Sequence, residues 1–149
     1  SEFDPANKNK YEENSKEYQD KIRQLQGKYR SSLANYKDIP IIIFHESFAY
    51  LADEFGLNVV HIVNLDSDTY LSANQVKEVI NKINQYDVKI LFTEAQYSSS
   101  IAESIADETD AQVYIVDSIV TGDEDKDAYI KGMEENLEKI VEAYEANWR

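Results

Sequence analysis

Three side chains that could bind a transition metal lie at the ends of three mostly apolar runs. They are His45, Glu94 and Asp117. Imidazole nitrogens and carboxylate oxygens are common ligands of zinc, manganese and iron. No lysine or arginine stands among them. The residue types therefore indicate a cation site, provided that the fold brings the three runs together.

Each of these residues also has an ordinary structural explanation. His45 could cap a helix that begins near Ser47, and Asp117 could be a turn residue. Glu94 could be a solvated carboxylate. His61 lies inside a predicted strand, so we interpret it as structural. The metal interpretation therefore depends on whether the three candidates share one edge of one sheet.

The sequence predicts four strands that alternate with helices. Apolar runs without polar alternation are typical of strands buried on both faces of a parallel sheet. The predicted strands are 41–44, 58–63, 88–93 and 112–116. Helical periodicity predicts helices over 48–55, 72–86, 98–109 and 127–147. Ser72 and Gln75 match a capping box at the start of the second of these helices. The alternation predicts right-handed crossovers and an α/β fold, a four-stranded parallel sheet flanked by helices.

We prefer the strand order 2-1-3-4, in which the first, third and fourth strands are neighbours. Their carboxyl ends then share one edge of the sheet. Ligands of open α/β sheets bind outside that edge, near the point where the strand order reverses. His45, Glu94 and Asp117 stand at or just past these ends, so this order places one imidazole and two carboxylates together.

A long helix is predicted to precede the sheet. Asp4 and Pro5 could open it, tyrosine and apolar residues recur at helical spacing as far as Tyr36, and Pro40 ends the helical region. Gly27 inside it marks a bend or a close contact. The helix is longer than the sheet requires, so it is either a coiled-coil arm or a spine that continues into further structure. We therefore divide the chain into three parts: 1–3, a cloning remnant; 4–36, the linker or spine helix; and 37–149, the α/β lobe.

Composition excludes several classes of protein and site. The 149 residues have a net charge of −14 and no cysteine, which disfavours nucleic acid as a partner and excludes thiolate metal sites. No Gly-rich phosphate loop is present. The spacing of acidic residues in 123–134 is similar to a calcium loop, but Ala128 stands where that loop requires glycine. We therefore do not predict calcium there.

Four blocks of the sequence together resemble a known family. They are FHESFAYLADEFGL, ILFTEAQ, YIVDSIVTG and YIKGMEENLEKIVEAY, preceded by DPAN and the long helix. This arrangement is similar to the C-terminal half of a zinc- or manganese-binding solute-binding protein of an ABC transporter. The family includes zinc-uptake proteins, laminin-binding lipoproteins and the pneumococcal surface adhesin type. The resemblance covers essentially the whole chain after residue 3.

The resemblance implies a site and a role. Two lobes joined by a rigid helix hold one metal ion between them, each lobe supplying two ligands. His45 matches the first ligand of the C-terminal lobe and Asp117 the second, while Glu94 matches a nearby carboxylate. Histidine at the first position favours zinc, with manganese as the alternative. The expected role is extracytoplasmic, periplasmic or lipid-anchored at the cell surface, and it is not enzymatic: the protein captures the ion and delivers it to an ABC permease.

Several expectations follow for this chain. The N-terminal lobe and its two ligands are absent from it, so zinc binding should be weak. The exposed part of the long helix could support self-association. Two other functions stay open: an adhesion module that binds a host extracellular-matrix glycoprotein such as laminin, or a hydrolase that uses the cation to activate water.

Overall fold

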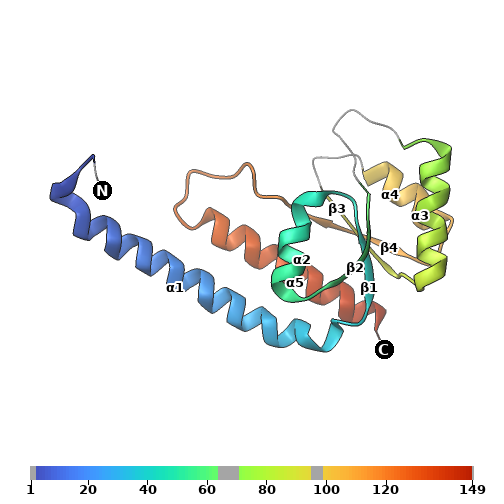
Figure 1. Cartoon of the computed structure of the whole chain (residues 1–149), viewed down its shortest axis with the longest axis horizontal. Helices are drawn as coiled ribbons and strands as arrows, with labels where there is room; N and C mark the ends of the chain where they lie inside the picture. The colour runs from blue at the N-terminus through green and yellow to red at the C-terminus, as the bar shows by residue number, and fades with distance from the viewer. Residues whose placement is uncertain (1–2, 64–70, 95–98, 149) are drawn as a thin grey trace.

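The four predicted strands form one parallel sheet. The computed structural model describes residues 3–63, 71–94 and 99–148. The strands are β1 (Pro40–Ile43), β2 (Asn58–Ile62), β3 (Ile90–Glu94) and β4 (Gln112–Val116), and their order is β2-β1-β3-β4 (Figure 1). All three pairings are parallel. The predicted fold class and strand order are therefore confirmed.

Helices cover both faces of this sheet. On one face lie α1 (Lys8–Leu33), α2 (Ala49–Phe55) and α5 (Ala128–Asn147), and on the other lie α3 (Ala73–Tyr86) and α4 (Ser99–Asp107). Ile41 and Ile43 pack into the first layer, and Ile42 and Phe44 into the second. Because successive residues of a strand point to opposite faces, burial on both sides explains the unbroken apolar run.

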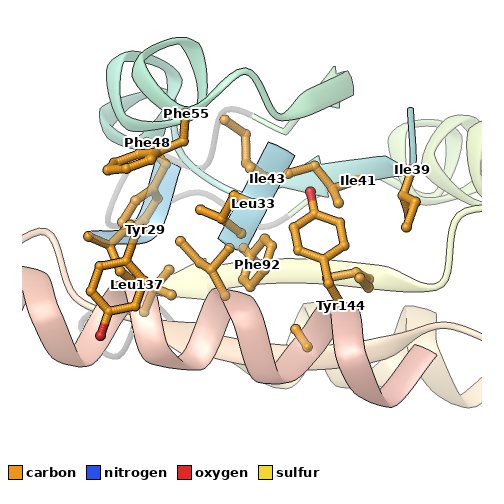
Figure 2. Packing of buried hydrophobic residues seen from close by; sticks show 14 residues of the cluster. Tyr29, Leu33, Ile39, Ile41, Ile43, Phe48, Phe55, Phe92, Leu137 and Tyr144 are labelled. Atoms are coloured by element: carbon orange, nitrogen blue, oxygen red, sulfur yellow. The ribbon is translucent and has the colours of Figure 1, made fainter. Parts of the chain in front are cut away.

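The long helix is an integral part of the first layer. Figure 2 shows Tyr29 and Leu33 of α1 beside Leu137 and Tyr144 of α5 and the sheet residue Phe92. Farther toward its N-terminus α1 extends past the other elements (Figure 1). The apolar stripe of α1 is therefore buried near the C-terminal end of the helix, at Tyr29 and Leu33, and exposed near its N-terminal end, at Tyr11.

The start of the long helix differs from the prediction. A short 3₁₀ helix, Pro5–Asn7, precedes α1, and the Asp4 side chain makes no capping hydrogen bond to the backbone. Its Oδ2 instead accepts hydrogen bonds from Asn7 Nδ2 at 2.7 Å and from Tyr11 Oη at 2.8 Å. Of the two explanations for Gly27, the close contact is wrong: among the described residues, no atom outside its own stretch of helix lies within 4 Å of the position that a Cβ would occupy.

Local chemistry fixes several of the other boundaries. Ser72 Oγ accepts from the Gln75 amide and the Gln75 side chain accepts from the Ser72 amide, so the predicted capping box is confirmed. Gly56 ends α2 with φ 66°, in the left-handed conformation that glycine adopts without strain. The third strand begins and ends later than predicted, at Ile90 and Glu94, because its ladder follows β1 and β4. The sequence also predicts a polar loop over 64–71, and residues 64–70 of it lie outside the described residues. No helix in the described ranges is both long and apolar enough to cross a membrane.

Candidate metal centre

The three candidate residues lie at the carboxyl edge of the sheet. Ile43 pairs with Phe92, and Glu94 pairs with Val116. The amide of Phe44 continues the ladder by donating to the Phe92 carbonyl at 2.8 Å. The chain then leaves the sheet beside the end of β3, through His45 on one side and Asp117 on the other. Adjacent strands are about 4.8 Å apart, so the β1 and β4 backbones are about 10 Å apart across β3.

The His45 ring lies between a hydrogen-bond donor and an acceptor. Its Nδ1 accepts from the Ser47 amide at 3.1 Å, which makes His45 the cap of the 3₁₀ helix Glu46–Phe48. The same Nδ1 lies 3.4 Å from Glu94 Oε1. These two contacts need different tautomers. Nδ1 can accept from the Ser47 amide only while its hydrogen is on Nε2. A ring with hydrogen on Nδ1 gives up that bond, points the hydrogen at the Glu94 carboxylate and presents the Nε2 lone pair to a metal. The capping explanation of His45 is thus confirmed, and the nearby Glu94 carboxylate allows the ring to change to the tautomer that a metal ligand needs.

Glu94 is a buried carboxylate and not a solvated one. It is 2% exposed, and Ser47 Oγ donates to its Oε1 at 2.5 Å. The solvated explanation of this residue is therefore wrong. A buried carboxylate is costly unless it is paired or hydrogen-bonded, and here its partners come from the segment that follows β1. Glu94 is thereby placed to orient the His45 ring from behind.

Asp117 is held by its backbone and by one carboxylate oxygen. Its amide donates to Asn136 Oδ1 at 2.8 Å, and Asn136 Nδ2 donates to its carbonyl at 2.6 Å. Asn136 is 1% exposed and belongs to α5. Asp117 Oδ1 accepts from the Ile119 amide at 2.8 Å. The residue itself is exposed at the edge of the sheet, so its carboxylate is accessible to a cation.

Of the three candidate residues, the structure places His45 and Glu94 in contact and leaves Asp117 outside that contact. His45, Ser47 and Glu94 form one connected group. Within residues 3–63, 71–94 and 99–148, no three His, Asp or Glu side chains are grouped so that they could hold an ion. A closed site with four protein ligands would therefore need donors from outside the described residues.

Sequence reasoning missed two residues of this edge, Ser47 and Asn136. Ser47 gives no signal of its own, since a serine near the start of a predicted helix is an ordinary residue there. Asn136 does give one, because it falls three residues after Met133 and four before Ile140 on α5. That spacing places an amide on the buried stripe of the helix, and a buried amide requires hydrogen-bond partners.

Comparison with known proteins agrees with this architecture. A family model described as "Zinc-uptake complex component A periplasmic" matches residues 1–143. The chain belongs to this family. The family resemblance seen in the sequence is therefore confirmed.

Named relatives of this zinc-uptake family include zinc and manganese transport proteins. The high-affinity zinc uptake system protein ZnuA of Bacillus subtilis is 32% identical over 144 residues, which cover 94% of this chain and 45% of the relative. The manganese ABC transporter substrate-binding lipoprotein PsaA of Streptococcus mitis is 29% identical over 147 residues, covering 93% and 47%. The chain thus spans about half the length of these relatives.

Solved structures of similar proteins share the fold. The solute-binding protein FpvC of Pseudomonas aeruginosa in complex with Ni²⁺ has a TM-score of 0.86 and 29% identity, covering 99% of this chain and 56% of that one. The laminin-binding protein Lmb of Streptococcus agalactiae, described as having adhesin and metal-transporting activity, has a TM-score of 0.81 and 25% identity, covering 95% and 55%.

Proposed function

We propose that this chain is the C-terminal lobe of an extracytoplasmic solute-binding protein that captures zinc in preference to manganese and delivers it to an ABC permease. The observation that supports this most directly is the His45–Glu94 contact at the carboxyl edge of the sheet. A carboxylate beside Nδ1 favours the tautomer with hydrogen on Nδ1, in which the Nε2 lone pair can bind a metal, and in that tautomer the Ser47 amide no longer donates to Nδ1. The ligands that we assign are His45 Nε2 and the Asp117 carboxylate, with Glu94 orienting the ring.

The donor set favours zinc over manganese. An imidazole nitrogen suits zinc, whereas manganese prefers sites made of oxygen donors. Glu94 does not change this preference, because it is buried behind the ring and hydrogen-bonded to Ser47. The names of the relatives include both metals, so this choice depends on the chemistry of His45.

Titration calorimetry with zinc and with manganese tests the proposal. We expect weak zinc binding to the 149-residue chain and weaker manganese binding. His45→Ala and Asp117→Ala should each reduce zinc affinity about tenfold or more, which is about 1.4 kcal/mol or more of binding free energy.

Two matched controls accompany these variants. His61→Ala removes the other histidine, which lies on β2. Asp107→Ala removes a carboxylate at the end of α4, near the amino end of β4. If the controls reduce affinity as much as His45→Ala and Asp117→Ala do, the assignment of the site is wrong. Unchanged binding in both ligand variants would also contradict it.

The remaining ligands, in this proposal, come from an N-terminal lobe that docks against the same edge. The relatives are about twice as long as this chain, and the described residues do not supply a third ligand. We place the complete protein outside the cytoplasm, in a periplasm or anchored by lipid at the cell surface. Zinc should bind a version extended by the preceding lobe far more tightly than it binds this chain.

Adhesion is a second candidate, and we regard it as an additional role. Similar structures include laminin-binding proteins of Streptococcus pyogenes and Streptococcus agalactiae. Surface plasmon resonance against laminin, with and without a metal chelator, tests this role, with serum albumin as the immobilised control. Equal signals on laminin and albumin would exclude it. The names of the relatives give no support to the hydrolase alternative, and we propose that the chain has no enzymatic activity.

A further inference from the structure

Ile119, two residues after Asp117, has a backbone conformation that β-branched residues rarely adopt. Its φ is 57°, in the left-handed region. The clash between the side chain and the backbone makes this conformation strained for isoleucine, and the surrounding structure must hold it in place. Strained residues of this kind cluster at functional sites, which makes the contacts of Ile119 informative.

Two contacts hold Ile119. Its amide donates to Asp117 Oδ1 at 2.8 Å. Its side chain packs against Gly132 of α5 so closely that a Cβ on Gly132 would lie 3.1 Å from Ile119 Cδ1 and 3.3 Å from Cγ1. Glycine is unfavourable inside a helix, and the packing of Ile119 explains why a residue without a side chain stands at this position.

The same helix also holds the Asp117 backbone. Asn136 follows Gly132 by four residues, so both lie on one face of α5. Asn136 makes hydrogen bonds to the amide and the carbonyl of Asp117. Gly132 packs against the side chain of Ile119, whose amide donates to the Asp117 carboxylate. Two adjacent turns of one helix therefore position both the backbone and the carboxylate of Asp117.

We propose that Ile119 and Gly132 form a positioning element for the metal-binding carboxylate of Asp117. The left-handed turn directs the Ile119 amide at Oδ1, which fixes the rotation of the carboxylate and leaves Oδ2 to face the ion. The packing on Gly132 holds the turn against its own strain. This inference rests on the proposed role of Asp117 as a ligand, and it assigns to Ile119 and Gly132 no contact with the metal.

The test is Gly132→Ala, with Gly27→Ala as the matched control. Both variants replace a helical glycine, but a Cβ at Gly27 would meet no described atom within 4 Å outside its own stretch of helix. Zinc affinity is measured by competition with a chromophoric chelator, and stability by urea unfolding without metal. We expect Gly132→Ala to lower zinc affinity about tenfold while its urea midpoint stays equal or rises. Gly27→Ala should raise the midpoint and leave the affinity unchanged.

A double-mutant cycle with Ile119→Ala shows whether the effect passes through Ile119. The atoms that would be crowded by the new Cβ are Cδ1 and Cγ1 of Ile119, and alanine lacks both. Adding Gly132→Ala to Ile119→Ala should therefore cause no further loss of affinity. The d–d absorption of bound Co²⁺ should change in Gly132→Ala and keep its form in Gly27→Ala, because a rotated carboxylate alters the coordination geometry.

Three results would overturn the inference. In the first, Gly132→Ala has the same zinc affinity and the same Co²⁺ spectrum as Gly27→Ala. In the second, Gly132→Ala lowers zinc affinity by the same factor in the parent chain and in Ile119→Ala. In the third, Gly132→Ala lowers zinc affinity only in proportion to a loss of stability in urea. Failure of the proposed function is distinguished by Asp117→Ala: if that variant binds zinc normally, the carboxylate is not a ligand and the positioning role falls with it.

Discussion

Replacing Asn136 should destabilise the protein and disorder the segment that contains Asp117. Asn136 is 1% exposed, and its amide group makes two hydrogen bonds to the Asp117 backbone, at 2.8 and 2.6 Å. A neutral hydrogen bond contributes about 0.5–1.5 kcal/mol of net stability, so two contribute about 1–3 kcal/mol. Because Asp117 is exposed, water can form hydrogen bonds with its amide and carbonyl in place of some of those that Asn136 made. We therefore expect Asn136→Ala to lower the free energy of unfolding by about 2 kcal/mol.

Urea unfolding followed by circular dichroism measures this change. Asn147→Ala is the matched control, because Asn147 is another α5 asparagine whose amide donates to Tyr114 Oη and the Ala143 carbonyl near the end of the helix. Fraying at a helix end makes such bonds less valuable, so the control should cost under about 1 kcal/mol. A loss in Asn136→Ala no larger than in Asn147→Ala would refute the reasoning.

Asn136→Asp adds a dependence on pH with a definite sign. A protonated carboxyl group can accept from the Asp117 amide and donate to its carbonyl, as Asn136 does. The ionised form cannot donate, and burial also disfavours it, so folding raises the pKa of the introduced group above about 3.9. The folded state then binds the proton more tightly, and stability falls as pH rises from about 4 through the raised pKa. A stability difference from the parent chain that does not change with pH would contradict this account.

Three further predictions concern the long helix and the core. Burial raises the pKa of Tyr144, whose hydroxyl has no hydrogen-bond partner among the described residues. Tyr144→Phe should therefore raise stability at pH 7 by about 1 kcal/mol. Above about pH 9 this variant should also escape the loss that the parent chain suffers as the unfolded phenol, with a pKa of about 10, ionises; equal pH profiles would count against it. Leu33→Ala should lower the free energy of unfolding in urea by about 3–5 kcal/mol, because Leu33 is fully buried. Leu25→Ala should lower it less, because Leu25 is only half-buried. Sedimentation should show concentration-dependent association through α1, where Tyr11 is 47% exposed, and Tyr11→Ser with Tyr18→Ser should weaken it; a strict monomer at high concentration would exclude this contact.

Much of the architecture could be predicted from the sequence because its causes are local. Apolar runs predicted each strand, and helical spacing predicted the helices. Because strands and helices alternate and βαβ crossovers are almost always right-handed, only a few topologies were possible. The capping box at Ser72 and the left-handed end at Gly56 involve residues at most four apart. Such features depend on backbone geometry and on near neighbours, which a sequence states directly.

Which residues stand at the carboxyl edge also followed from the sequence, since strand ends and strand order determine it. What those residues do there required the tertiary structure. Glu94 is buried and accepts a hydrogen bond from Ser47, which lies 47 residues earlier in the chain. The Asp117 backbone is fixed by Asn136, which lies 19 residues later, on α5. The reason for a glycine at position 132 is a side chain on another segment. Contacts of this kind depend on how helices and strands pack against one another, and the positions of distant elements are determined only when the whole core is assembled.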